Sequence, residues 1–359
     1  MHMWLLRYLK RITSALENRT TLIKELQPIE MMKKILLATI IGLVTTLPAG
    51  AQQHKPVPVI FDTDMGPDYD DVGAITLLHA FADNGEAKIL ATIASTNYEH
   101  VGPVLNVLNT YFKKPQIPVG VPKEKALGLR DWQHWSDTLV TKYPHAIKSN
   151  DETGDAVVLY RKILSAQPDN SVTIVTVGFF TNLSALLQST SDKYSPLNGK
   201  DLVKKKVKQL VSMAGGFPAG NEFNVNKDAP ASKNVAENWP TQILFSGFEI
   251  GKKIKCGLPL IHNNAIQNSP VKDVFRICIP MAAEDKDGRM SWDETAVLVA
   301  VKGYSDYYTI QRGTMHVNEK DGSNTWTNDN NGLHAHLIEK APVEEVRNLI
   351  DQLMMHQPK

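Results

Sequence analysis

The chain has 359 residues, of which 42% are hydrophobic and 21% are charged, and its formal net charge is +1. This is the composition of an ordinary globular protein with enough apolar residues for a large core. A net charge near zero argues against a broad phosphate-binding surface, so we expect no nucleic acid polymer as a partner.

Residues 32–51 have the order of a secretory signal peptide. Two lysines follow Met32, an apolar stretch comes next, and Ala49-Gly50-Ala51 provides a small-x-small cleavage site. We therefore predict cleavage before Gln52. The apolar stretch is short for a membrane span, so we expect no stable membrane insertion after processing.

The residues before this segment, 1–31, do not fit the layout of a signal peptide. We interpret them as an upstream extension that is not translated, with Met32 as the start of the protein. The alternative is a real amphipathic segment that tethers the protein to the inner membrane. In both cases we expect the body of the protein to be periplasmic or secreted.

After the signal peptide, apolar runs rich in β-branched residues alternate with segments of helical periodicity. Strands are predicted over residues 57–64, 87–95, 117–122, 171–178, 206–216, 241–247 and 333–339. Helices are predicted over residues 71–83, 101–112, 155–166, 181–189, 292–303 and 342–356. This alternation predicts an α/β fold with a Rossmann-like, open, mostly parallel sheet flanked by helices.

No repeat or linker interrupts this pattern, so we predict that residues 52–359 form a single domain. A polar, aromatic segment at residues 128–153 is long for a connection without regular structure, which suggests a lid or binding flap. Cys256 and Cys278 lie in apolar surroundings. Two buried thiols are the favoured interpretation, and one disulfide is the alternative in an oxidising compartment.

The stretch "VIFDTDMGPDYDDVGAI", residues 59–75, places five aspartates within ten positions after a predicted core strand. Ligands of open parallel sheets bind beyond the carboxyl ends of the strands. Several carboxylates in one place need a cation, or one of them must take up a proton. Oxygen ligands without His or Cys suit calcium or magnesium.

Two other interpretations of this stretch remain open. The aspartates can be helix caps and turn residues around Gly66-Pro67. They can also belong to a phosphatase of the haloacid dehalogenase type, in which Asp62 would be the nucleophile. Such a phosphatase needs its second acidic pair much later in the chain, whereas here Asp70 and Asp71 follow closely.

The order of strand, "DTDMG", turn, "DD" and small-residue helix resembles the inosine-uridine-preferring nucleoside hydrolase family, whose signature is Asp-x-Asp-x-Gly-x-Asp-Asp. This chain has two extra residues before the final pair. We align Asp64 with the second aspartate of the signature and Asp70-Asp71 with its pair, which leaves Asp68 surplus.

Four further stretches resemble the family in the same order: "ATIASTNYEHVGPVLNVLN", "VTVGFFTNLSALL", "VSMAGGFPAGNEFNVNKD" and "SWDETAVLVA". The resemblance spans roughly residues 57 to 302. It implies the nucleoside hydrolase fold and a calcium ion held by Asp64, Asp71, Asp293 and the backbone carbonyl of Val177.

The same resemblance implies how the site would work. Asp64 would be the general base that takes a proton from metal-activated water. Asp70, Asn97, Glu222 and Asn224 would hydrogen-bond the ribose hydroxyls, and Asp70 and Asn97 would belong to the catalytic set. Their oxygens would stabilise the oxocarbenium character that develops on the sugar.

One departure from the family concerns the leaving base. Many members have a histidine before the late aspartate, and this chain has Trp292 there. Trp292, with Trp132 and Trp135, could stack on the base. His134 is a candidate for binding the base and protonating it, and His100 is comparable.

We therefore expect an exported enzyme that hydrolyses the N-glycosidic bond of ribonucleosides and depends on calcium. The alternatives are hydrolysis of another ribosyl compound and non-catalytic binding of a nucleoside or sugar. The presence of Asp64 argues against pure binding, because a binder does not need a water-activating carboxylate. The partner is a small nucleoside or riboside, and the family resemblance also implies a homo-oligomer.

Overall fold

The computed structural model describes residues 55–124 and 126–359, together with residues 11 and 13. The predicted signal peptide and nearly all of the predicted upstream extension lie outside the described residues. No helix within the described part of the chain is long and apolar enough to cross a membrane. Residues from Lys55 onward cluster into a single unit of the fold.

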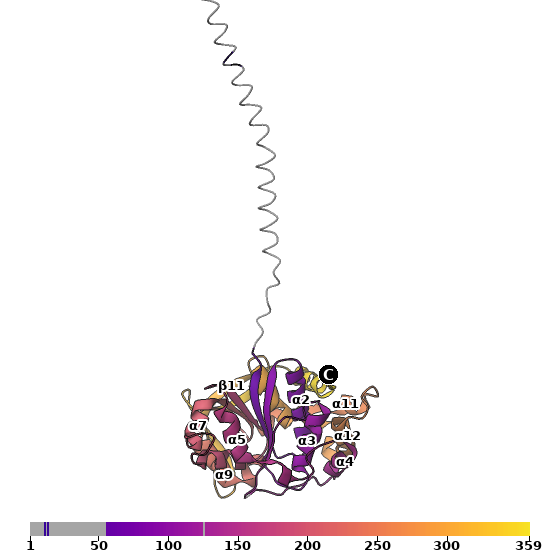
Figure 1. The fold of residues 1–359 in the computed structure, drawn as a ribbon, viewed down its shortest axis with the longest axis horizontal. Helices are drawn as coiled ribbons and strands as arrows, with labels where there is room; N and C mark the ends of the chain where they lie inside the picture. Colours follow the sequence, from indigo (N-terminus) through magenta and orange to yellow (C-terminus); the bar gives the residue numbers. More distant parts are fainter. Residues whose placement is uncertain (1–10, 12, 14–54, 125) are drawn as a thin grey trace, which may run out of the picture. The chain divides into compact units, whose positions relative to one another are not determined.

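The centre of the fold is a parallel sheet (Figure 1). Eight neighbouring strands run in the same direction because helices connect them. In spatial order they are β4 (Gly154–Asp155), β3 (Val119–Val121), β2 (Ala87–Ala94), β1 (Val57–Thr63), β5 (Val172–Thr176), β6 (Val207–Met213), β8 (Gln242–Ser246) and β13 (His334–Glu339). The predicted α/β class and mostly parallel sheet are confirmed.

Three antiparallel strands extend the sheet beyond β13. They are β11 (Tyr308–Val317), β12 (Asn324–Asn328) and β7 (Ala219–Gly220), which brings the main sheet to 11 strands within the described residues. A separate pair, β9 (Lys255–Cys256) and β10 (Arg289–Met290), lies outside this sheet. This small pair fixes the backbone at Arg289.

Helices cover both faces of the sheet (Figure 1). The first face packs on α2 (Asp70–Asp83), α3 (Val101–Tyr111), α13 (Trp292–Lys302) and α14 (Val343–Met354). The second face packs on α5 (Ala156–Ser165), α6 (Thr181–Gln188), α7 (Gly199–Lys206) and α9 (Ala229–Asn238). The remaining helices are α4 (Trp135–Lys142), α8 (Phe223–Lys227), α10 (Phe248–Gly251), α11 (Leu258–His262) and α12 (Pro270–Cys278).

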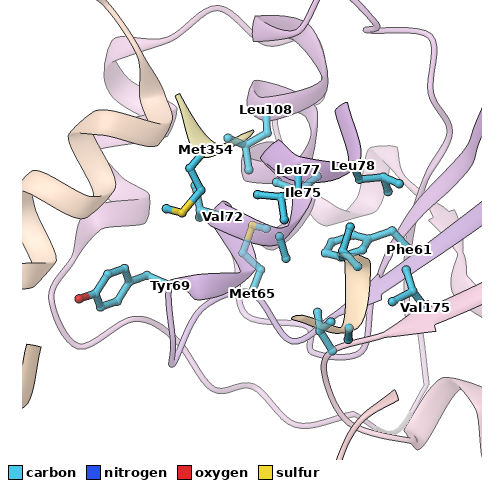
Figure 2. Packing of buried hydrophobic residues seen from close by; sticks show 14 of the residues in the cluster. Phe61, Met65, Tyr69, Val72, Ile75, Leu77, Leu78, Leu108, Val175 and Met354 are labelled. Carbon is cyan, nitrogen blue, oxygen red and sulfur yellow. The ribbon is translucent and has the colours of Figure 1, made fainter. Parts of the chain in front are cut away.

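Side-chain alternation along β1 explains why both faces are apolar. Val59 and Phe61 face the cluster around α2, whereas Ile60 faces the cluster around α5 and α6. Figure 2 shows Phe61 beside Ile75 and Leu78 of α2 and near Val175 of β5. Because α2 lies between the sheet and the outer helices, it is buried on nearly all sides, and its first turn is held firmly over the end of β1.

The segment at 128–153 has more structure than the sequence suggested. It contains α4 and a short 3₁₀ helix at Asn150–Glu152, and α4 packs on α3 and α12. Trp135 and Leu139 are fully buried in that packing. Cys256 and Cys278 are buried free thiols, as the favoured interpretation expected.

Candidate active site

A cavity of about 150 Å³ opens at the carboxyl ends of β1, β5, β6 and β8. Its lining comes from the loops that follow these four strands and from the start of α13, as expected for an open parallel sheet. The lining residues are Asp64, Asp68, Asp70, Asp71, Val177, Met213, Glu222, Phe223, Asn224, Phe248, Trp292 and Asp293.

Asp64 follows β1 directly and is buried at the cavity wall. The turn after β5 approaches it closely, because a Cβ atom at Gly178 would lie 2.3 Å from the backbone nitrogen of Asp64. Only glycine leaves room for this approach, and it brings Val177 to the same cavity. Burial raises the pKa of Asp64 well above its usual range, and the charges of Asp71 and Asp68 raise it further.

Asp71 lies in the first turn of α2, and the hydroxyl of Thr63 donates a hydrogen bond to its Oδ1. Its other oxygen, Oδ2, is buried and has no hydrogen-bond partner. Burial, followed by the charge of Asp70, raises the pKa of Asp71 to about 8. An unpartnered buried carboxylate oxygen is costly unless a cation or a proton compensates it.

Asp293, in the first turn of α13, comes from more than 200 residues later in the chain and meets the aspartates of α2. One carboxylate oxygen from each of Asp70, Asp71 and Asp293 lies within 4.8 Å of the others. Burial raises the pKa of Asp293 well above its usual range, with further contributions from Asp70 and Asp71. This convergence of three buried carboxylates is the arrangement that a divalent cation stabilises.

The predicted donor set consists of oxygen atoms alone, which suits a hard divalent cation such as calcium or magnesium. The carboxylates of Asp64, Asp71 and Asp293 and the carbonyl of Val177 all face one cavity, so every predicted ligand is an oxygen. The carbonyl of Val177 accepts a hydrogen bond of 2.9 Å from Asn224 Nδ2, and its second lone pair is available to an ion. The unpartnered Oδ2 of Asp71 is a buried acceptor that such a cation would satisfy.

Asp70 has a different environment from its neighbour. Its Oδ1 accepts hydrogen bonds from Arg289 Nε at 3.1 Å and Nη2 at 2.8 Å. Its Oδ2 accepts from the backbone nitrogens of Trp292 at 3.2 Å and Asp293 at 3.3 Å. The side chain predicted to hold ribose hydroxyls is therefore already bonded to the protein on both oxygens.

Arg289 is a site residue that the sequence analysis missed. Its guanidinium is buried, pairs with Asp68, Asp70 and Asp285, and lies over the ring of Tyr69 at 4.9 Å. Charge balance was the available signal, because a cluster of aspartates close together in the sequence needs a cation and Arg289 precedes the late Trp-Asp motif by three residues.

Glu222, at the N-cap of α8, and Asn224, in its first turn, both line the cavity. Glu222 caps this helix by accepting hydrogen bonds from the backbone nitrogens of Asn224 at 2.8 Å and Val225 at 3.2 Å, and it also accepts from Gly215 at 3.1 Å. Burial raises the pKa of Glu222 to about 7, against the lowering effect of these donors. Helix capping and contact with a ligand are compatible here, because both residues face the cavity.

Aromatic rings form the mouth of the cavity. Trp292 stacks on Phe248 with ring centroids 5.2 Å apart, and its Nε1 donates to the carbonyl of Phe248 at 2.8 Å. Phe223 and Phe248 are partly exposed at the opening. Trp132 and Trp135 do not line the cavity; Trp132 is exposed and Trp135 is part of the core under α4.

Two predicted site residues lie away from this cavity. Asn97 is exposed after β2, where its backbone nitrogen bonds to Leu127, and β2 ends beside β1 on the side away from β5. His134 is exposed at the start of α4 and pairs with Asp137 at 3.1 Å. None of the histidines that the structure describes lines the cavity.

Asp62 points towards α5 and α6 and away from the cavity lining. Its Oδ2 accepts hydrogen bonds from the hydroxyl of Tyr160 at 2.7 Å and from Asn182 Nδ2 at 3.0 Å. It is fully buried and does not line the cavity. The phosphatase interpretation, which needs Asp62 as a nucleophile, has no support in this geometry.

Known proteins resemble this chain in sequence and in fold. A pyrimidine-specific ribonucleoside hydrolase, RihA, from Shewanella sp. (strain ANA-3) is 27% identical over 236 residues. That match covers 63% of this chain and 66% of the length of RihA, so the chain matches just under two thirds of this relative.

Two solved structures share the fold. The plant nucleoside hydrolase PpNRh1 has a TM-score of 0.63 and 21% identity, over 84% of this chain and 99% of its own. The purine-preferring ribonucleoside hydrolase from Gardnerella vaginalis has a TM-score of 0.65 and 16% identity, over 83% of this chain and 99% of its own. The model of the family described as inosine-uridine preferring nucleoside hydrolase matches residues 59–348, and this chain belongs to that family.

Proposed function

We propose that the protein is an exported, calcium-dependent hydrolase that cleaves the N-glycosidic bond of ribonucleosides into a free base and ribose. Family membership supports the reaction class. Two observations support the metal: the cluster of buried carboxylates of Asp70, Asp71 and Asp293, and the buried oxygen Oδ2 of Asp71, which has no hydrogen-bond partner. The aromatic mouth of the cavity supports a planar base as the leaving group.

Calcium would be held by Asp64, Asp71, Asp293 and the carbonyl of Val177. When bound, it would neutralise the carboxylates, make water more acidic and bind hydroxyl groups of the sugar. Asp71 and Asp293 are fixed at the starts of two helices, α2 and α13, which pack on each other. The ligand set would therefore be preorganised by the core.

Asp64 would take the proton from the attacking water. Burial raises the pKa of this carboxylate in the absence of the ion, which favours a role as proton acceptor. The close approach of Gly178 places Asp64 beside Val177, another predicted ligand, at the cavity wall. Loss of the Asp64 carboxylate is expected to remove the base while two carboxylate ligands remain.

The sugar would lie between the aspartate carboxylates and the start of α8, where Glu222 and Asn224 lie. As the glycosidic bond lengthens, positive charge develops on the ribose ring. Glu222 and the aspartates around the cavity would stabilise this charge, and the backbone donors to Glu222 hold its carboxylate in place. Asn224 is held by Val177 and Met213 and would orient a hydroxyl.

The leaving base would stack on Trp292, Phe248 and Phe223. No lysine, arginine or histidine is among the described residues that line the cavity. We therefore propose that stacking and solvent, instead of a histidine, assist departure of the base. This arrangement would favour bases that are easily protonated or intrinsically good leaving groups.

We also propose that the protein acts outside the cytoplasm after cleavage before Gln52. The support is the order of charged, apolar and small residues in 32–51. N-terminal sequencing of the protein recovered from periplasm or medium tests this directly. A mature protein that starts at Met1 would contradict it.

The function is tested by product analysis with the purified mature protein. Inosine, adenosine, uridine, cytidine and p-nitrophenyl riboside are incubated with calcium or with a chelator, and free ribose and free base are both quantified. We expect ribose and base in equal amounts, and only with calcium. Calcium-dependent release from the activated riboside alone would favour another ribosyl compound as substrate. Nucleoside binding without ribose release from any compound would favour a non-catalytic binder.

A further inference from the structure

The two extra residues of the aspartate motif and the surplus Asp68 have no role in the calcium site described above. In the structure, Asp68 and Tyr69 of this longer turn both contact Arg289. Asp68 forms an ion pair with Arg289 Nη2, and Asp70 accepts from the same guanidinium at 2.8 Å and 3.1 Å. The longer turn therefore places two carboxylates, at both ends of Asp68-Tyr69-Asp70, on one arginine.

Tyr69 and Asp285 complete this group. The hydroxyl of Tyr69 donates to Asp285 Oδ2 at 2.6 Å, and Asp285 lies 3.8 Å from Arg289 Nη1. The guanidinium lies over the rings of Tyr69, at 4.9 Å, and Trp292, at 5.1 Å. A guanidinium can lie over two rings while two of its nitrogens donate to one carboxylate oxygen, and lysine cannot reproduce this set of contacts.

The backbone of Arg289 is itself fixed. It belongs to β10, which pairs with Cys256 of β9, and a Cβ atom at the preceding Gly288 would lie 2.8 Å from the carbonyl oxygen of Cys256. Gly288 also has a φ of +109°, which favours glycine. Because this backbone cannot shift easily, Arg289 can serve as a fixed point for the acidic turn.

Asp70 transmits this fixed point to the calcium site. Its second oxygen accepts from the backbone nitrogens of Trp292 and Asp293, the first two residues of α13. Arg289 thus holds Asp70, and Asp70 holds the end of α13 from which Asp293 reaches the carboxylate of Asp71. The contacts thus lead from the buried guanidinium of Arg289, through Asp70, to Asp293, which is a predicted metal ligand.

We propose that Arg289 is a positioning residue of the calcium site and that the two-residue insertion of the motif exists to supply its second anchor, Asp68. The inference rests on the proposed calcium site. In it, Asp70 holds the start of α13 and does not bind the sugar. Arg289 itself touches neither the ion nor the substrate.

The test is calcium binding to the metal-free mature protein, measured by titration calorimetry with calcium alone. The variants are Arg289→Lys, Arg289→Gln and Asp68→Asn. The matched control is Arg276→Gln, because Arg276 is an exposed arginine that also pairs with an aspartate, Asp273, at 3.3 Å. Circular dichroism and thermal unfolding in chelator establish that each variant is folded.

A positioning role predicts that Arg289→Lys and Arg289→Gln both weaken calcium binding, by about 10-fold to 100-fold, the range found when outer hydrogen-bond partners of metal ligands are removed. Asp68→Asn leaves both hydrogen bonds from Arg289 to Asp70 intact, so it should weaken calcium binding less than Arg289→Lys does. Arg276→Gln should stay within about twofold of the wild type, as expected for an exposed pair.

If Arg289 only compensates charge, the expected change in calcium affinity is the opposite. Loss of a positive charge near the ion would make Arg289→Gln bind calcium more tightly, and Arg289→Lys would bind like the wild type. Either result overturns the proposal. If Arg289→Gln does not fold, calcium binding to Arg289→Lys distinguishes positioning from charge compensation, because lysine retains the positive charge.

The calcium titration also separates this inference from the proposed function. A wild-type protein that binds calcium but releases no ribose would overturn the function, and the comparison of variants would still stand. A wild-type protein that releases ribose, with Arg289→Lys binding calcium as tightly, would overturn only the role of Arg289. Absence of calcium binding in the wild type would overturn the inference together with the calcium site.

Discussion

Asp70 and Asp71 are neighbours in the chain, yet their carboxylates have opposite surroundings. Both oxygens of Asp70 accept hydrogen bonds from Arg289 and from the start of α13, whereas Oδ2 of Asp71 is buried without a partner. Successive residues at a helix start point in different directions, so an adjacent pair can divide two tasks. In our proposal, Asp70 organises the site and Asp71 binds the cation.

Asp71→Asn is expected to abolish activity and calcium binding. The same change should stabilise the metal-free protein at a pH of about 9, because it removes a buried carboxylate whose pKa is raised to about 8 and which must ionise there without a partner. Chemical denaturation with and without calcium measures both effects. Asp306→Asn, at an exposed position, is the control. Wild-type activity in Asp71→Asn would show that the ion binds elsewhere.

Asp62 should make stability depend on pH independently of calcium. Burial raises its pKa from 3.8 to about 7. The folded state therefore holds a proton that the unfolded state loses, so the contribution of Asp62 to stability is full below pH 3.8 and is lost as the pH rises towards 7. The slope is about 1.4 kcal/mol per pH unit in that window.

Asp62→Asn removes this titration and keeps the shape of the side chain. Its free energy of unfolding in chelator should fall less between about pH 5 and pH 7 than that of the wild type. Denaturation curves at several pH values measure the difference. Parallel curves for the wild type and Asp62→Asn would mean that Asp62 is ionised in the folded protein.

Phe248→Ala is expected to reduce kcat/KM for nucleosides by about tenfold, since stacking between a base and an aromatic ring contributes roughly 1–3 kcal/mol. Trp132→Ala is the matched control, because Trp132 is exposed but lies outside the cavity lining. Steady-state kinetics on the best nucleoside of the panel compares the two. Equal losses in both variants would contradict stacking at the cavity mouth.

His134→Ala should leave the pH profile of kcat unchanged and alter kcat/KM by less than about twofold. The imidazole is exposed, pairs with Asp137 and does not line the cavity, and removal of an exposed pair has little effect. A profile measured across the acidic and neutral range checks this. Loss of one limb of the profile would restore His134 as the acid that protonates the base.

The parallel sheet, its flanking helices other than α7 and α9, and most of the acidic site could be predicted from the sequence. Strands buried on both faces have continuous apolar runs, and helices between them have clear periodicity, so local pattern and tertiary structure agree. The family resemblance is confirmed, and eight of the ten predicted site residues line one cavity; they are Asp64, Asp70, Asp71, Val177, Glu222, Asn224, Trp292 and Asp293.

What the sequence missed depends on contacts between distant residues. Arg289 and Asp70 are 219 positions apart, and no local pattern pairs them. Asn97 has the residue type of a site member, but strand order places it one strand too far from the cavity. Helix α12 is also absent from the predicted elements, but here the sequence carried a local signal. Ser269 caps the helix before Pro270, and its apolar residues recur at helical spacing.

The most direct test of the account is ribose release by the metal-free wild-type protein as calcium is added back, measured beside calcium binding on the same sample. The account predicts no ribose without calcium, and activity that rises in proportion to the fraction of protein with one ion bound. Full activity in the presence of chelator, or saturation with calcium without any release of ribose, would contradict it.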